Sequence, residues 1–210
     1  MLVGDPRQLG PFTDIDEDLR NLLPEYPLLN EDILKESILD HFIEHSEATN
    51  CHRLSKQYRM VPAIGNLISQ MFYEGAVETE SKDSLMNLSA VFEQPVTFFS
   101  TSALSNRFET KAKTSYQNLL EVNVIGDLVL RLLDVLEEKT ITNFSICLLS
   151  GYAAQVTELN RMLLDIPHPD SIVISAGTVD TFQGREADVA IYSVTRSNSE
   201  NRSSDHHQDR

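Results

Sequence analysis

The sequence predicts an α/β fold built around a parallel β-sheet. Its clearest strands, residues 144–149 and 189–194, are short apolar runs without the alternation of polar and apolar side chains typical of a half-exposed strand. Segments with helical periodicity separate such runs, which is the pattern of parallel strands joined by helices. Strands of this kind are buried on both sides, so we expect helices on both faces of the sheet.

The start of the chain predicts a strand end, a loop and one helix. Residues 2–3 are interpreted as the end of a buried strand, and the Gly-Asp-Pro of residues 4–6 stops it with a loop. Residues 30–44 place apolar side chains on one helical face, with Asn30 as the N-cap.

The next segments are shorter and more polar. Residues 53–60 predict an extended segment, and residues 63–72 predict a helix that Gly75 ends. Residues 79–87 predict a polar surface excursion, and residues 96–100 a short strand.

The second half carries the strongest patterns. Residues 115–138 predict the longest helix, with apolar side chains along one broad face. The 144–149 strand is followed by a helix through Gln155, Leu159 and Leu163. Further strands are predicted at residues 172–174, 178–182 and 189–194, and a polar, disordered tail at residues 197–210.

Composition limits the possible partners and the compartment. A net charge of -15 argues against a bulk basic surface for nucleic acid, although the acidic excess is concentrated in residues 1–50 and leaves room for a local basic groove. Cys51 and Cys147 form no CxxC pair, so we expect no disulfide-linked partner, no zinc site and a reducing intracellular compartment. No apolar run approaches the roughly 20 residues of a membrane span, so we expect no membrane partner.

Three polar stretches at predicted strand ends carry the candidate chemistry, because doubly wound sheets bind ligands there. They are residues 4–11, 57–62 and 178–188. Taken singly, each also fits a plain turn, a solvated surface pair or a strand-to-helix loop. Their chemistry suits phosphate, since an amide can sense a phosphate, a guanidinium can bind it with two hydrogen bonds, and a glycine lets backbone N–H groups approach it.

In series, the three stretches resemble a known family. GDPRQLGP, QYRMVPAI and TVDTFQGREADVAIYSVTR are similar to motifs III, IV and V of superfamily 1 helicases, especially the nonsense-mediated-decay type RNA helicases. Two further signatures support the resemblance, the segment around Tyr116 with Asn118 and Glu121, and Gly151-Tyr152 with Gln155. The resemblance covers most of residues 2–196.

The resemblance implies a RecA-like fold of the P-loop NTPase class, incomplete at both ends of this chain. ATP would lie in a cleft between two such halves, with single-stranded nucleic acid across them. Residues 1–50 would be the tail of the first RecA-like domain, residues 51–196 most of the second, and residues 197–210 a disordered tail.

The resemblance also implies roles for individual residues. Arg59 looks like an arginine finger, and Gln8 looks like a γ-phosphate sensor. The implied nucleotide-binding residues are Tyr58, Gly184, Glu186 and Asp5.

Three residues are implied on the nucleic-acid side. Thr178 would lean toward the nucleic-acid backbone. Tyr152 and Asn118 are further candidates, for which a packed tyrosine and a helix-capping asparagine are equally good interpretations.

Two departures from the family matter. No G-x-x-x-x-G-K-[ST] phosphate loop occurs and no Asp-Glu pair is identified as the family's magnesium motif, so ATP and Mg²⁺ would be bound mainly by a missing upstream half. After Arg196 the family's Val-Ala-Leu-Thr-Arg-Ala element is replaced by a polar segment.

Two functions follow as hypotheses. The first is part of an ATP-dependent helicase or translocase that is inactive as an isolated fragment and works with the first RecA-like half. The second is a non-catalytic module that binds nucleic acid or a partner. A kinase or transporter ATPase fragment is disfavoured because QYRM and FQGRE have no counterpart there. RNA and DNA both remain open, as do cytoplasm and nucleus.

Overall fold

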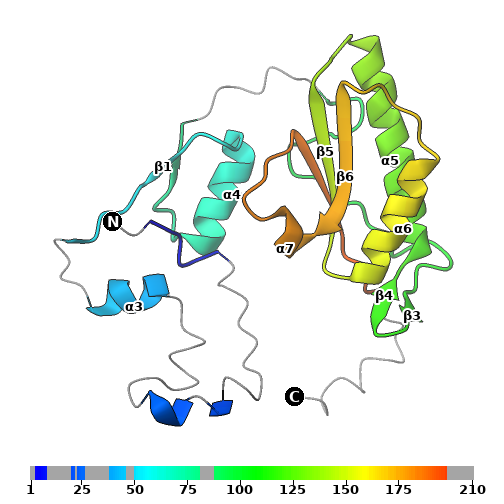
Figure 1. Cartoon of the computed structure of the whole chain (residues 1–210). Coiled ribbons are helices and arrows are strands. Elements are labelled where there is room, and N and C mark those ends of the chain that lie inside the picture. The colour runs from blue at the N-terminus through cyan, green and yellow to red at the C-terminus, as the bar shows by residue number, and fades with distance from the viewer. Residues whose placement is uncertain are drawn as a thin grey trace. The chain divides into compact units, whose positions relative to one another are not determined.

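The computed structural model describes residues 3–8, 20–21, 23–26, 38–45, 50–80 and 88–197 (Figure 1). The chain divides into two compact units, Met1–Leu85 and Met86–Arg210. We describe each unit by itself.

The first unit is built from short elements. They are the 3₁₀ helix η1 (Leu23–Glu25), helix α3 (Ile38–His45), strand β1 (Lys56–Gln57), helix α4 (Pro62–Phe72) and strand β2 (Glu78–Thr79). Strands β1 and β2, which precede and follow α4 in the sequence, pair with each other in parallel. The prediction of an extended segment followed by a helix is therefore confirmed here.

Local sequence sets both ends of α4. Pro62 occupies its first turn, where a missing N–H costs nothing. At the other end Gly75 has a φ of 77°, and its N–H donates to the Ser69 carbonyl at 2.9 Å. This left-handed conformation favours glycine, which is why the helix stops where the sequence predicted.

The second unit contains a hairpin and a parallel sheet. The hairpin consists of β3 (Thr110–Ala112) and β4 (Ser115–Gln117). Helix α5 (Leu119–Glu138) follows it, then β5 (Phe144–Ser150), α6 (Ala153–Leu164), β6 (Ile172–Thr178), the short helix α7 (Val179–Phe182) and β7 (Val189–Ser193). The three parallel strands lie in the order β6-β5-β7, so the prediction of an α/β fold with a parallel sheet is confirmed.

The core lies between the sheet and the two long helices (Figure 1). Leu132 and Leu136 of α5 and Leu159 of α6 are fully buried against Ile146 and Leu148 of β5. Both helices pack on the same side, while Val173 on β6 and Tyr192 on β7, the two strands that flank β5, are 61% and 54% exposed. Within this unit the long helices thus cover one face and not both. In the crossover from β6 to β7, residues 179–188, just the four residues of α7 are helical, which are too few to cover a face.

Three other predictions about elements are wrong. Residues 96–100 form no strand, because they have no ladder partner in the described structure, and Phe98 is 82% exposed. Residues 115–117 do not begin the long helix, because they pair with β3 as strand β4. Residues 179–182 are helical and not a strand, because the Thr178 side chain caps them as α7.

Several other expectations fall at the edge of the described residues. Val3 is exposed and lies in no strand, since none of the described segments pairs with it. Asn30, residues 81–87 and residues 198–210 lie outside the described residues. Cys51 and Cys147 are unpaired thiols, and burial raises the pKa of the Cys147 thiol. None of the described helices is both long and apolar enough to span a membrane.

Candidate functional site

The carboxyl end of the parallel sheet gathers several candidate residues of the second unit. Tyr152 follows β5, Thr178 ends β6, and Arg196 comes shortly after β7. Parallel strands end at one edge of a sheet, so these three residues share that edge, where α/β folds bind ligands.

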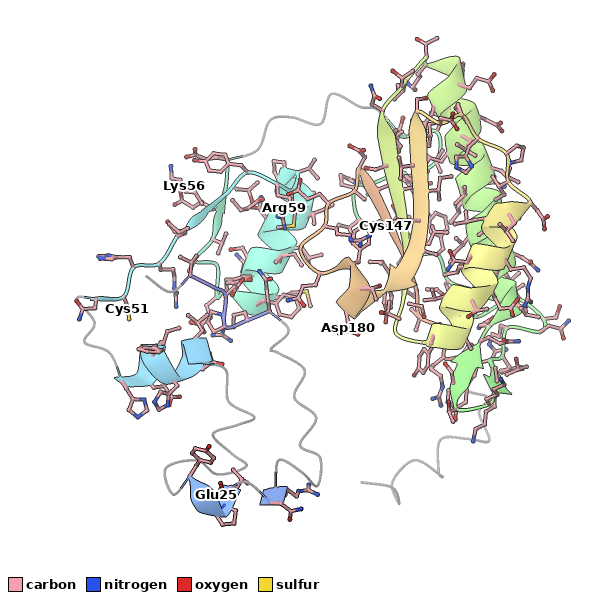
Figure 2. All side chains as sticks on the ribbon, viewed as in Figure 1. Glu25, Cys51, Lys56, Arg59, Cys147 and Asp180 are labelled. Atoms are coloured by element: carbon pink, nitrogen blue, oxygen red, sulfur yellow. The ribbon has the colours of Figure 1, made fainter. Side chains whose placement is uncertain are left out.

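The segment after β6 forms a tight loop at this edge. Oγ1 of Thr178 caps α7 by accepting a hydrogen bond from the Thr181 N–H at 3.4 Å. Asp180 lies on this short helix (Figure 2). Gly184 has a φ of 79°, and a Cβ added there would meet no atom within 4 Å. The backbone at Gly184 is therefore open to an approaching ligand, and Glu186 beside it is exposed.

A pocket of about 390 Å³ adjoins this loop. Arg185 is the one cationic side chain in its lining, and the hydroxyls of Thr178, Thr181 and Ser175 also line it. The wall is completed by Ala176 and Gly177 of β6, Ala153 and Val156 of the first turn of α6, and Phe182 of α7. Its single cation and hydroxyl groups suit an anion such as a phosphate.

Tyr152 belongs to an aromatic and charged cluster. Its ring meets the Tyr116 ring edge-on, with centroids 5.8 Å apart. The Arg196 guanidinium lies over the Tyr116 ring at 4.2 Å, and its Nε donates to Glu109 Oε1 at 3.1 Å. Although burial acts against it, hydrogen bonds from the Ser197 N–H and Arg196 hold the pKa of Glu109 below its usual value.

Asn118 is fully buried and caps α5. Its side-chain oxygen accepts the Glu121 N–H at 3.2 Å, and its amide nitrogen donates to the Arg107 carbonyl at 2.8 Å. The structure thus places Asn118 in the helix-capping role, one of the two interpretations open from the sequence.

A buried polar network connects Asn118 to the end of β7. Ser193 Oγ and the Thr195 N–H both donate to the Glu121 carboxylate, at 2.5 and 2.9 Å. Thr195 has a φ of 68°, which is rare for a β-branched residue and costs free energy. The hydrogen bond to Glu121 helps to hold this strained backbone.

In the first unit, Gln57 organises the turn that carries Tyr58 and Arg59. Its Oε1 accepts the N–H groups of Arg59 and Met60 at 2.9 and 2.8 Å. Its Nε2 donates to the Met60 carbonyl and to Thr79 Oγ1. Arg59 is thereby held between β1 and α4 (Figure 2).

Tyr58 is exposed and contacts Glu80, the residue that directly follows β2. Its hydroxyl donates to Glu80 Oε2 at 3.2 Å, and Lys56 forms an ion pair with the same carboxylate. The hydrogen bonds from Lys56 and Tyr58 lower the pKa of Glu80.

Asp5 and Gln8 come together in the first loop. The Asp5 carboxylate accepts hydrogen bonds from Tyr73 Oη at 2.6 Å, Gln8 Nε2 at 2.9 Å and the Arg7 N–H at 3.0 Å. Partial burial opposes these bonds, but together they hold the pKa of Asp5 below its usual value.

The candidate residues therefore fall into separate groups. Asp5 and Gln8 form one group and the QYRM turn another, both in the first unit. Thr178, Gly184, Glu186 and Tyr152 lie at the sheet edge of the second unit, and Asn118 lies beneath it.

Sequence reasoning missed Glu109 and the role of Arg196. A single glutamate in a loop gives no signal of its own, because its partner Arg196 is distant in sequence. The sequence pattern marks Asn118, Glu121 and Gln155 as parts of two family signatures, but it does not indicate that they form one buried network.

Comparison with known proteins shows a family. The model of the AAA domain family matches residues 34–209. This match covers most of the chain.

Curated relatives with related sequences are mostly named helicases. The chain is 24% identical over 200 residues to the 5'-3' DNA helicase ZGRF1 of Mus musculus, covering 93% of the chain and 10% of the relative. It is 27% identical over 202 residues to Helicase SEN1 of Saccharomyces cerevisiae, covering 93% of the chain and 8% of that protein. It is also 27% identical over 207 residues to the Regulator of nonsense transcripts 1 homolog of Neurospora crassa, covering 94% of the chain and 17% of that protein. The chain thus spans less than a fifth of each of these three relatives.

Proposed function

Because the chain belongs to the AAA domain family and has relatives that are named helicases, we propose that it forms part of an ATP-dependent helicase or translocase. Residues 1–50 contribute the tail of a first RecA-like domain, and residues 51–196 most of a second. We place this protein inside the cell, in the cytoplasm or the nucleus.

The observation that carries this proposal is the loop between β6 and β7. It lies at the carboxyl end of a parallel sheet, with Gly184 in a left-handed conformation and a pocket lined by Arg185 beside it. Backbone N–H groups next to a glycine, together with a guanidinium, are suited to bind an anionic ligand. Gly184 and Glu186 would face the nucleotide, and Thr178 the nucleic-acid backbone.

The turn held by Gln57 would place Arg59 for the hydrolysis of ATP. The Gln57 side chain accepts one hydrogen bond from the Arg59 N–H and one from the Met60 N–H, which hold the backbone of the turn that carries Arg59. The guanidinium of Arg59, carried on this turn, would stabilise charge that develops on a transferred phosphoryl group. Tyr58 would lie near the base or ribose.

Asp5 and Gln8 would couple nucleotide state to nucleic-acid binding. The Gln8 amide is oriented by the Asp5 carboxylate, which also binds Tyr73. A γ-phosphate that attracted the Gln8 amide would therefore compete with Asp5 for it.

On the nucleic-acid side we retain Thr178 and Tyr152 and omit Asn118. A side chain with no exposed surface cannot contact a ligand without local opening, and Asn118 is fully buried. The ligand is single-stranded RNA or DNA.

The residues of this chain fit only part of an ATP site. Arg59 in the first unit and the Gly184 loop in the second each suit the charged groups of a phosphate, whereas the sequence has no G-x-x-x-x-G-K-[ST] phosphate loop. ATP and Mg²⁺ would supply the phosphoryl group and its charge neutralisation, held mainly by the partner RecA-like half.

The lack of a phosphate loop also favours a second candidate, a non-catalytic module that binds nucleic acid or a partner. Phosphate-release assays distinguish the two. We expect no hydrolysis by residues 1–210 alone, and hydrolysis stimulated by single-stranded oligonucleotide in the longest natural product that contains them. A longer product that binds oligonucleotide but hydrolyses no ATP would favour the second candidate.

A further inference from the structure

A groove of about 490 Å³ lies between α5 and α6. Its floor includes Gly126, where a Cβ would come within 3.4 Å of the Met162 side chain. The missing side chain leaves a channel between the helices. Leu119 and Leu130 line it and remain 51% and 45% exposed.

The distance between Leu119 and Leu130 gives the length of the apolar part of this groove. They are both on α5, and at about 1.5 Å per residue they lie about 16 Å apart along the axis. This distance is about three helical turns. A helix laid along the groove would thus bury apolar side chains at positions i, i+4, i+7 and i+11.

The rim of the groove is acidic. Asp127, Glu158 and Asp165 line it together with one cation, Arg161. Arg161 already forms an ion pair with Glu158 at 2.6 Å. In the part of the chain that the structure describes, Asp127 and Asp165 have no ion-pair partner.

This charge pattern discriminates between possible occupants. Phosphates of a nucleic acid would be repelled by the rim. A second copy of this chain, with a net charge of -15, is an unfavourable partner for the same reason. An apolar helix face flanked by lysine or arginine would pack on the apolar floor of the groove and pair its cations with the rim carboxylates.

We propose that the α5–α6 groove is a docking site for a basic amphipathic helix of a partner protein. None of its residues belongs to the nucleotide or nucleic-acid groups described above, so this inference does not depend on the proposed function. Burial of the two leucines would supply affinity, and the rim carboxylates would select the charge of the partner.

Two matched peptides test the proposal on the 210-residue chain. Both carry leucine at positions i, i+4, i+7 and i+11 in an alanine-rich helix, one flanked by lysines and the other by glutamates at the same positions. In fluorescence anisotropy we expect the lysine peptide to bind about tenfold more tightly, since each exposed ion pair contributes up to a few-fold in affinity. Its affinity should fall as salt is added.

Variants test the groove itself. Leu130→Glu should abolish binding of the lysine peptide, and the double variant Asp127→Lys with Asp165→Lys should reverse the preference in favour of the glutamate peptide. Asp134→Asn removes an exposed carboxylate of α5 outside the groove lining and should leave both affinities unchanged. A loss of fold cannot produce a reversed preference.

Three results of the peptide experiments would overturn the proposal. They are equal binding of the two peptides, no binding of the lysine peptide by the unmodified chain, and an unreversed preference in the double variant. A concentration-dependent dimer that disappears in Leu130→Glu would also overturn it, because the occupant would then be a second copy.

Discussion

Asn118 and Gln155 exchange two hydrogen bonds. The Asn118 N–H donates to Gln155 Oε1 at 2.7 Å, and Gln155 Nε2 donates to the Asn118 carbonyl at 3.2 Å. Both residues are fully buried, and Gln155 Nε2 also donates to Ser193 Oγ at 2.9 Å. The Gln155 amide therefore fastens the start of α6 to the start of α5 and the end of β7, directly beneath the edge that carries the candidate ligand residues.

The first prediction concerns this amide. Gln155→Ala leaves the buried Asn118 N–H without its partner, whereas the Asn118 carbonyl still accepts the Val122 N–H at 3.2 Å. An unsatisfied buried group costs about 1–3 kcal/mol, so we expect the free energy of unfolding to fall by about that amount in urea titrations. Asn160→Ala, an exposed position on the same helix, is the control and should change stability by less than about 0.5 kcal/mol. Equal effects of the two substitutions would contradict a structural role for the network.

The second prediction concerns pH. The pKa of Glu109 is lower in the folded chain than in the unfolded one, so the unfolded chain binds the proton more readily. The stabilisation by ionised Glu109 is thus fully present above pH ~4.3, the ordinary glutamate pKa. It is lost as the pH falls through the lower, folded pKa.

Comparison with Glu109→Gln measures this contribution. We expect the unmodified chain to exceed the variant in unfolding free energy at neutral pH, and the difference to shrink steadily below pH ~4.3. A difference that stayed constant down to acid pH would show that the Arg196 ion pair contributes nothing to it.

The third prediction concerns Arg59. In the longest natural product containing this chain, Arg59→Ala should lower steady-state ATP hydrolysis by a factor on the order of 10³ while nucleotide affinity changes by a few-fold, because a finger acts on the transition state. Phosphate release and a nucleotide titration measure the two effects. Arg53→Ala replaces another exposed arginine before β1 and should hydrolyse normally. Unchanged turnover in Arg59→Ala would remove Arg59 from the catalytic set.

The fourth prediction separates a sensor from a hydrolytic group. Gln8→Ala in the same product should weaken the stimulation of hydrolysis by single-stranded oligonucleotide more than the basal rate, because a sensor transmits the state of one site to the other. Turnover with and without oligonucleotide is the measurement. A proportional loss in both conditions would mean that Gln8 acts in hydrolysis itself.

The sequence by itself determined the elements whose signals are local. Helix α4 begins at Pro62 and is terminated by Gly75, and the apolar run of β5 and the periodicity of α5 and α6 lie within single segments. Burial of a continuous apolar run or of one helical face has a large hydrophobic free energy, so these patterns predict their structure without knowledge of neighbours. Of the three motif stretches predicted at strand ends, residues 57–62 lie at the end of β1 and residues 178–188 at the end of β6, whereas residues 4–8 follow no strand among the described residues.

The tertiary structure alone decided whatever depends on a distant partner. Residues 115–117 became a strand because residues 110–112 lie opposite them, while residues 96–100 found no ladder partner among the described residues. Asn118 proved to be buried because Gln155 and Thr195 enclose it, and Glu109 acquired a role because Arg196 reaches it from far along the chain. Hydrogen bonds and ion pairs between distant segments leave no periodic trace in a sequence, since each is specified by one residue at each end and by the fold that brings them together.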